Sequence, residues 1–457
     1  MGFDPNQLYL SRICRFLDSL CFGQMMAGSQ QVQRAPPPQD RSEPSLRTDF
    51  NWTLAGNVVY SLCQWGMLSV LAKAGNAGIV GQFALALAIA APVFMFTNLA
   101  LRGVQVSDAR REYQFGDYFT VRFVTTLGGL LVIATVVPFL HLDNTTRAVT
   151  ILIALAKSLE CVSDVIGGFL QVHGRLDQAA VSLMIRGGLS VIAFGGTFLF
   201  SHNLVACCAA MCLAWAAVLV GYDLRRAANL LRAGETYFHW DWGPIRKLVV
   251  LSSPLGFVMM LLSLNANIPR YTLQHYGGPA ELGIFASLAY LLVASGTVVN
   301  ALSVSAIVRL SSMFAVNDFG GFKKLMYKLV GIGVAMTALG LLLAALFGRI
   351  VLTLLYRPEY ADRMVTFLIM VAAGGVGAVG CFLGTGVTAA RCFVAQVPLT
   401  AACTLTVVAT TAVLVPRYGS VGAALALLGS SIVLVVGCAV VLRMAFRWAR
   451  KAQIESV

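Results

Sequence analysis

Charged side chains are scarce in this chain, and their scarcity decides its structural class. Of 457 residues only 12% are Asp, Glu, Lys or Arg, whereas soluble domains average about 25%. Apolar residues make up 58%, and the mean hydropathy is +0.78. They gather in repeated runs of about 20 residues, the length that crosses the hydrocarbon core of a bilayer as a helix. These features predict an all-α, polytopic membrane protein, because a membrane β-barrel would show short alternating segments instead.

Motifs for nucleotide hydrolysis and for metal chemistry are also missing. The sequence has no G-x-x-x-x-G-K-[ST] loop, which excludes nucleotide hydrolysis by that route. It has no H-E-x-x-H or paired-Cys zinc pattern, and its 11 cysteines are scattered, mostly inside apolar runs. We therefore expect no cofactor and no metal. The loops that would face outward are short, so we also expect no catalytic domain there and no enzyme activity.

Acidic residues are fewer than basic ones, and the formal net charge is +13. Such a charge suits nucleic-acid binding, but in a membrane protein basic residues mark the cytoplasmic side. Most of the 33 Lys and Arg residues fall in alternate segments between the apolar runs. This bias predicts that both termini lie in the cytoplasm and that nucleic acid is not a partner.

Twelve apolar runs are long enough to span the membrane. They cover residues 52–72, 78–101, 119–140, 148–171, 180–200, 204–222, 247–268, 281–302, 325–347, 363–386, 393–415 and 421–442. The expected domains are a disordered or amphipathic cytoplasmic tail at 1–46, a six-helix lobe at 47–222, a cytoplasmic surface linker at 223–246, a second six-helix lobe at 247–446 and a cytoplasmic tail at 447–457.

A hairpin of two spans, residues 254–309, has an earlier counterpart in the chain. A shift of 202 residues carries the motif Gly81-Gln82-Phe83-Ala84 onto Gly283-Ile284-Phe285-Ala286, and Asn98 onto Asn300. The matches fall in corresponding places and in the right order. They indicate a duplication into two halves in parallel orientation, as some transporters have.

A polar stripe runs along the fourth span. Lys157, Glu160, Asp164 and Gln171 are spaced by 3, 4 and 7 residues, which places them on one face of a helix. A charge near the bilayer centre costs about 2.5–3.5 kcal/mol on insertion scales, so each of these groups needs an explanation. Two interpretations are open: Lys157 and Glu160 form a self-neutralising structural pair, or the stripe lines a water-accessible cavity.

Other polar residues within the spans are further candidates for a cavity. The group consists of Asn57, Asn265, Asn267, Arg122, Arg186 and Arg270. Arg122 is predicted to snorkel to the cytoplasmic interface, whereas Arg186 lies deeper and is better placed to face a cavity. Arg270 follows Pro269 at the outer end of the seventh span, where it would anchor the helix or flank a portal.

Several segments resemble a known family of transporters. The segment Leu46-Arg47-Thr48-Asp49-Phe50-Asn51-Trp52 before Gly56-Asn57 resembles the first helix of bacterial polysaccharide flippases, the Wzx-type branch of the superfamily that includes the MATE multidrug extruders and the lipid II flippase. Similar matches are Gly81 to Leu85, Pro92, Leu101 to Ala109, Pro254-Leu255-Gly256, Asn265 to Tyr271, Glu281 to Ala286 and Leu355 to Tyr360.

The resemblance covers residues 46–446 and implies twelve helices in two six-helix lobes around a central cavity. In this family a cationic cavity is thought to hold the diphosphate of an undecaprenyl-linked oligosaccharide, but no fixed motif assigns that role to single positions. The substrate-binding candidates here are Lys157, Arg186, Arg122, Arg270, Asn57, Asn265 and Asn267. Glu160 and Asp164 are the candidates for ion coupling.

The function expected from this resemblance is that of a flippase in the bacterial inner membrane. Its substrate would be a lipid-linked oligosaccharide repeat unit, and its partners would be membrane lipids and the polymerase and glycosyltransferases of the same pathway. A multidrug or cation antiporter of the MATE type is the alternative, which Glu160 and Asp164 keep open. A membrane sugar polymerase or ligase fits less well, because it needs a sizeable outer loop with basic and His residues.

Overall fold

The computed structural model describes residues 46–108, 111–231, 235–390 and 392–455. These residues are almost entirely helical and contain no strand, which confirms the predicted all-α class. The tail predicted at 1–46 lies outside them except for Leu46. The helices are α2 (Leu46–Ala74), α3 (Ala77–Thr97), α4 (Leu101–Ser107), α5 (Phe115–Val136), α6 (Asn144–Val172), α7 (Leu176–Ser190), α8 (Gly196–Ser201), α9 (Leu204–Val218), α10 (Leu224–Ala228), α11 (Trp242–Leu291), α12 (Val293–Ala315), α13 (Phe319–Leu355), α14 (Pro358–Ala361), α15 (Met364–Ala389) and α16 (Phe393–Glu455).

Each of the twelve predicted spans is helical over most of its length in the described structure. Ten segments of the described chain are long and apolar enough to cross a membrane. Two of them, α11 and α16, each consist of two helices joined at a glycine, since Gly278 and Gly419 have positive φ angles of 73° and 55°. The charged α6, with 29 residues, is a further helix of spanning length.

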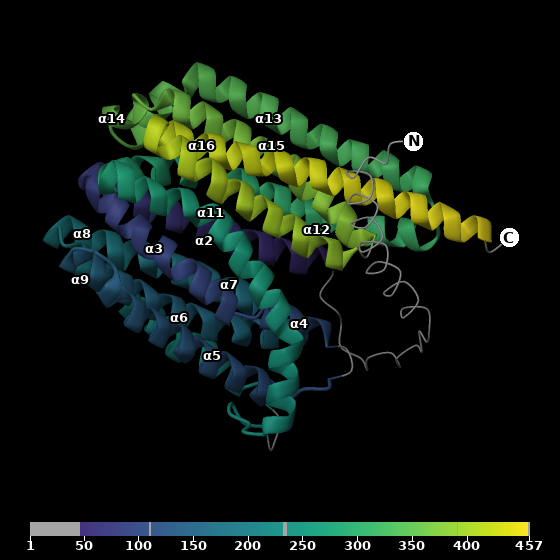
Figure 1. The fold of residues 1–457 in the computed structure, drawn as a ribbon. Helices are drawn as coiled ribbons and strands as arrows, with labels where there is room; N and C mark the ends of the chain where they lie inside the picture. The colour runs from purple at the N-terminus through teal and green to yellow at the C-terminus, as the bar shows by residue number, and fades with distance from the viewer. Residues whose placement is uncertain (1–45, 109–110, 232–234, 391, 456–457) are drawn as a thin grey trace.

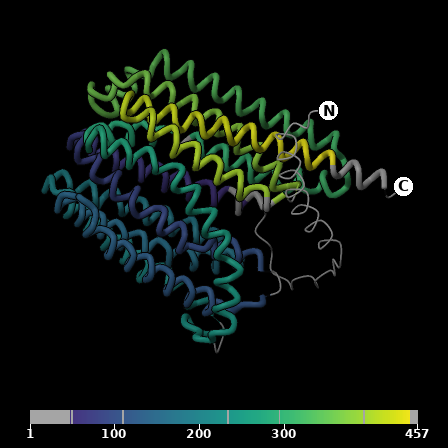
Figure 2. The backbone as a smooth tube through the Cα atoms, viewed as in Figure 1, coloured from purple at the N-terminus to yellow at the C-terminus, as the bar shows by residue number. Residues whose placement is uncertain are grey.

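The helices form two groups joined by α11 (Figure 1). One group contains α2 to α9, and the other contains α12 to α16. α11 packs extensively against both α3 and α16, so it ties the groups together. In this view the groups lie close at the end that carries α8, α9 and α14, and they diverge toward α4 and the C-terminus, as the backbone trace also shows (Figure 2).

The repeated glycine motif lies where α3 crosses the part of α11 that follows its bend. A Cβ atom added to Gly81 would collide with the carbonyl oxygen of Pro279, and one added to Gly283 would collide with the carbonyl oxygen of Ala77. The shift that carries Gly81 onto Gly283 also carries Ala77 onto Pro279. The contact is therefore reciprocal, as in a two-fold interface. Only glycine lets the two backbones come this close.

Polar contacts join the two groups at the same end of the molecule. The indole of Trp65 donates to the hydroxyl of Tyr356 at 3.1 Å. The Lys73 ammonium donates to the carbonyl of Leu354 at 3.0 Å, and the Arg357 guanidinium donates to the carbonyl of Lys73 at 3.2 Å. These contacts and the glycine crossing close this end of the molecule in the conformation described.

The segment predicted as a surface linker, 223–246, is partly buried. The sixth span continues past α9 through a π-helix, η3 (Leu219–Asp223), into α10, so Asp223 lies inside the protein. Further on, the described residues of the linker pack on the start of α5. The His239 imidazole lies 2.6 Å from Asp117, and the ring of Phe238 packs against Phe119 at 5.2 Å between centroids.

Candidate functional site

The charged pair of α6 forms as its spacing predicts. The Lys157 ammonium lies 2.6 Å from the Glu160 carboxylate, and the hydroxyl of Tyr60, from α2, donates to the same carboxylate at 2.9 Å. The side chains of Lys157 and Glu160 remain 30% and 25% exposed. The pair is thus neutralised internally but still accessible, which leaves both interpretations from the sequence open.

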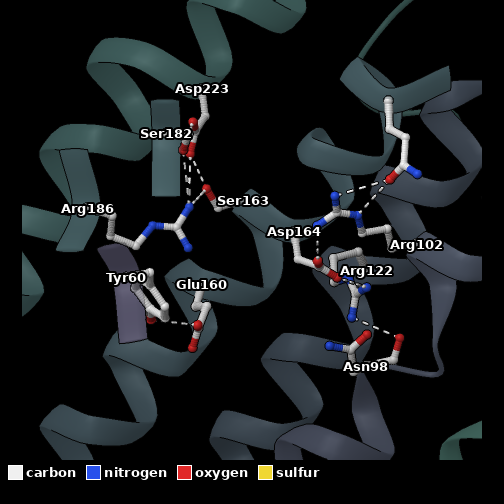
Figure 3. Close-up of polar contacts among 11 residues, drawn as sticks. Tyr60, Asn98, Arg102, Arg122, Glu160, Ser163, Asp164, Ser182, Arg186 and Asp223 are labelled. Atoms are coloured by element: carbon white, nitrogen blue, oxygen red, sulfur yellow. Dashed lines mark hydrogen bonds and ion pairs between the residues drawn. The ribbon is translucent and has the colours of Figure 1, made fainter. Parts of the chain in front are cut away.

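Arg186 lies near Glu160 in a buried cluster with Ser163, Ser182 and Asp223 (Figure 3). Its guanidinium is 3.4 Å from the Asp223 carboxylate, which also accepts hydrogen bonds from the hydroxyls of Ser163 and Ser182. Asp223 ends the π-helix η3, a distortion that is frequent at functional sites. Arg186 is therefore buried and paired, and it borders only a small cavity in this conformation.

Arg186 and Lys157 are nevertheless coupled through one aromatic ring. Both cations lie over the indole of Trp215, at 5.8 Å and 5.9 Å from its centroid. Arg186 also interacts electrostatically with Glu160. A cation over an indole gains about 0.5–1 kcal/mol where it is exposed and about 2 kcal/mol where it is desolvated, so Trp215 stabilises the buried Arg186 more than the partly exposed Lys157.

Asp164, the next charged residue along the stripe, is shared by two arginines (Figure 3). Arg102 and Arg122 each lie 3.3 Å from one of its oxygens, and Arg102 also donates to the side chain of Gln171 at 3.2 Å. Arg122 is fully buried and donates to the backbone carbonyl of Asn98 at 2.9 Å. The predicted snorkelling of Arg122 is therefore wrong, because its guanidinium pairs within the protein. A substrate role would require this buried group to be uncovered.

The charges around α6 do not cancel. Four cations meet three carboxylates in the pairs Arg102–Asp164, Arg122–Asp164, Lys157–Glu160 and Arg186–Asp223. One positive charge is left over, since Asp164 serves two arginines. A cavity of about 70 Å³ reaches several of these groups, with room for a few water molecules. The net positive charge of these residues around α6 therefore favours the binding of an anion.

Arg270 lies on α11 and has no carboxylate partner among the described residues. Its guanidinium donates to the side-chain oxygen of Asn267 at 3.1 Å, while its Nε atom is buried without a partner. Arg270 is thus a cation of α11 whose charge is not neutralised by any described carboxylate.

The three asparagine candidates occupy different surroundings. Asn57 is exposed and donates to the carbonyl of Thr53 in its own helix at 2.8 Å. Asn267 is buried beside Arg270. Asn265 points into the second helix group, where it exchanges hydrogen bonds with Ser430 at 3.1 and 3.2 Å. They do not form one cluster.

Several polar residues of the site were not predicted from the sequence, among them Asp223, Arg102 and Tyr60. Asp223 was assigned to the linker because the residues after it are polar, so hydropathy places the end of the sixth span before Asp223 although the helix continues through it. Arg102 follows a break at Leu99 and Ala100, where positive φ angles redirect the chain and turn α4 toward α6. Tyr60 gave no signal, since a tyrosine in a span is common at membrane interfaces.

Known proteins are similar to this chain over most of its length. Capsular polysaccharide biosynthesis protein CapF from Staphylococcus aureus is 27% identical over 391 residues, 85% of this chain and 97% of that protein. Lipid II flippase MurJ, in an inward closed conformation, superposes with a TM-score of 0.67 at 10% identity, over 86% of this chain and 88% of its own. A mutant of the Vibrio cholerae MATE transporter VcmN gives a TM-score of 0.60 at 12% identity, over 89% and 96%. No protein-family model matches the sequence.

These likenesses show the fold and confirm the resemblance that the sequence motifs indicated. The chain is a multi-pass membrane protein with the fold shared by MATE transporters and MurJ. Over most of its length it is also similar in sequence to a protein named for capsular polysaccharide biosynthesis. The similar structures are transporters and a flippase, not enzymes.

Proposed function

We propose that this chain is a flippase that moves undecaprenyl-diphosphate-linked oligosaccharide repeat units across the bacterial inner membrane. It would do so by alternating access, with the two helix groups opening in turn to each side. The transporter fold, the similarity to a flippase and the similarity to a capsular polysaccharide biosynthesis protein support this function.

The observation that carries the proposal is the excess of cations over carboxylates around α6, together with the unpaired cation Arg270 on α11. The charged residues around α6 carry one excess positive charge, and Arg270 on α11 has no carboxylate partner among the described residues. Transfer of a charged diphosphate into hydrocarbon without partners is prohibitively costly. A site that keeps the phosphates hydrated and near Arg270 and Lys157 removes that barrier, while the polyprenyl chain stays in the lipid.

Loading would exchange one ion pair for another. When a phosphate approaches, Lys157 turns from Glu160 toward it, and Glu160 keeps its hydrogen bond from Tyr60 and the field of Arg186. Glu160 is thus not left unpartnered, and the exchange stays close to balanced in free energy. A substrate-linked change in the partner of one side chain is the kind of differential contact that shifts a conformational equilibrium.

A charge swap tests this step. Lys157→Glu combined with Glu160→Lys preserves an ion pair, so a purely structural pair tolerates it, whereas a substrate site loses transport. The matched control reverses the exposed pair Arg175 and Asp177, whose atoms lie 3.6 Å apart. We expect the α6 swap to abolish polysaccharide export at normal membrane levels and the control swap to preserve it. Full export by the α6 swap would remove Lys157 from the substrate site.

An antiporter for cationic drugs is the second candidate, because MATE transporters share the fold. A cationic drug needs a carboxylate that it can approach, but Glu160, Asp164 and Asp223 are each paired with a basic side chain. Asp164 faces two arginines, whereas Glu160 faces one lysine at close range, so Glu160 is the better candidate for ion coupling. Efflux of a cationic dye by cells that express the chain would favour the antiporter.

We also propose an orientation with both termini in the cytoplasm. The basic residues concentrate on that side, and the diverging end of the molecule carries the C-terminus (Figure 1). The conformation would then be closed toward the outside and ready to take up substrate made in the cytoplasm. Glycosyltransferases that build the repeat unit and a polymerase that consumes it would act before and after this step.

A further inference from the structure

The second helix group contains a cavity with an uncharged lining, in contrast to the charged residues around α6. It has a volume of about 340 Å³ and lies between α11, α15 and α16. Among the described residues no charged side chain lines it, and its polar lining consists of an amide, hydroxyls and a thiol, contributed by Asn265, Thr400, Cys403, Ser430 and Ser431. The size falls in the range of small-molecule sites, and the neutral lining excludes a diphosphate as its occupant.

The polar groups of this cavity have unused hydrogen-bonding capacity. Asn265 and Ser430 bond to each other, but an amide offers two donors and two acceptor lone pairs, so part of Asn265 remains available. The hydroxyl of Ser431 has no hydrogen-bond partner within the described part of the chain. Donors and acceptors that the fold does not need for itself are what a polar, uncharged ligand requires.

One side of the cavity lies one helical turn from Arg270, a residue of the proposed diphosphate site. Ala266 lines the cavity and is exposed, and Arg270 follows four residues later on the same helix. Residues four apart in an α-helix lie on one face, one turn apart. A ligand with its phosphates at Arg270 can therefore reach the cavity with the group attached directly to them.

We propose that this cavity is a subsite for the uncharged sugar ring attached to the diphosphate. The inference rests on the proposed function and adds to it a site for the glycan. Sugar hydroxyl or acetamido groups would bond to Asn265 and Ser431, while Gly374 and Gly377 leave space for the ring. Binding gains affinity only where these groups reproduce the hydrogen bonds of the water they displace. An acidic sugar is rejected, because no cation of the described chain lines the cavity to face it.

Two substitutions test the subsite without touching the charged groups. Ser431→Ala removes a hydroxyl that the fold does not use. Gly377→Val fills the cavity, since a Cβ at Gly377 already lies 3.5 Å from the Ser431 hydroxyl. The control is Gly384→Val on the same helix, where the nearest atom is 3.9 Å away and belongs to Cys438, which does not line the cavity.

The measurement compares two probes on the purified full-length protein in nanodiscs. One is undecaprenyl diphosphate, and the other is the same lipid carrying a single N-acetylhexosamine. We expect the wild type to bind the glycosylated lipid about tenfold more tightly, as one or two neutral hydrogen bonds allow. Gly377→Val should bring the ratio of the two Kd values to about one, and Ser431→Ala should reduce it severalfold. Neither should change the Kd for the bare diphosphate.

The outcomes separate the subsite from the proposed function. Equal binding of the two lipids by the wild type, or an unchanged ratio in both variants, overturns the subsite and leaves the flippase proposal intact. Failure of the wild type to bind either lipid overturns both. A reduced ratio in Gly384→Val equal to that in Gly377→Val also overturns the subsite, because the effect would then come from helix packing.

Discussion

Replacement of Gly81 by alanine should open the end at which the two helix groups meet. The added methyl would overlap the carbonyl oxygen of Pro279, a backbone atom that cannot rotate away. Gly283→Ala repeats the perturbation at the reciprocal contact with Ala77. The clash exists only while α3 and α11 cross closely, so it destabilises the closed arrangement relative to one in which the crossing is released.

The size of the shift follows from the energy of overpacking. Extra methyl groups in well-packed contacts cost about 1–3 kcal/mol. Alanine also favours the helix by up to about 1 kcal/mol over glycine, but this gain applies to both conformations and cancels from the equilibrium between them. A difference of about 1–3 kcal/mol changes the ratio of open to closed molecules about 5- to 150-fold.

Labelling of a single cysteine measures this ratio. Ser287 is buried and lies one helical turn beyond Gly283, so a reagent reaches it only when the crossing opens. We would place Ser287→Cys in a variant without other cysteines and treat intact cells with a membrane-impermeant maleimide. The labelling rate should rise with Gly81→Ala by the factor above and more with the double alanine variant. Gly128→Ala, where no neighbouring atom lies within 4 Å, should leave the rate unchanged.

A particular combination of results would refute this reasoning. If Gly81→Ala lowers Tm but leaves the labelling rate of Ser287→Cys at its original value, the crossing persists in every conformation. The glycine pair would then be a permanent joint between the two groups and not a contact that is made and released.

Other contacts give three further expected outcomes. Asp223→Asn should destabilise the protein by about 3–5 kcal/mol, because it leaves Arg186 as a buried unpaired cation, and Arg186→Gln in the same chain should restore much of the lost Tm. The bond from His239 to the start of α5 raises its pKa above about 6.5, so linker docking should be complete at pH 6 and weaken as pH rises through the raised pKa. Hydrogen exchange of residues 235–241 should show this dependence, and His239→Gln should abolish it. Single cysteines replacing Glu235 and Arg357 should label from opposite sides of the membrane; labelling of both from outside contradicts the orientation.

The spans were predictable because length and hydropathy alone decide whether a helix can cross a bilayer. The repeat that carries Gly81 onto Gly283 was also visible in the sequence, but the contact between its two copies was not predicted from it. The pairing of Lys157 with Glu160 followed from their spacing, because residues three apart share a helix face. The spans, the repeat and the Lys157–Glu160 pair could all be recognised because each depends on nearby residues or on a regular spacing in the sequence.

The rest of the site depends on contacts between distant segments. Nothing in the sequence near Asp164 indicates that Arg102 and Arg122 both reach it, because the break before α4 is set by tertiary packing. Asp223 could not be paired with Arg186 by spacing, since 37 residues and a π-helix separate them. Arg122 was misjudged because snorkelling assumes that water is the nearest partner for a cation in a span.

The most direct test of the central claim is lipid translocation in proteoliposomes that contain only this protein. The probe is a fluorescent polyprenyl-diphosphate saccharide, and the measurement is the rate at which it becomes accessible to an impermeant quencher on the opposite side. We predict a rate well above that of protein-free liposomes, which Arg270→Gln and the Lys157–Glu160 charge swap both abolish. A rate equal to that of empty liposomes, or one unchanged by both variants, would contradict the account.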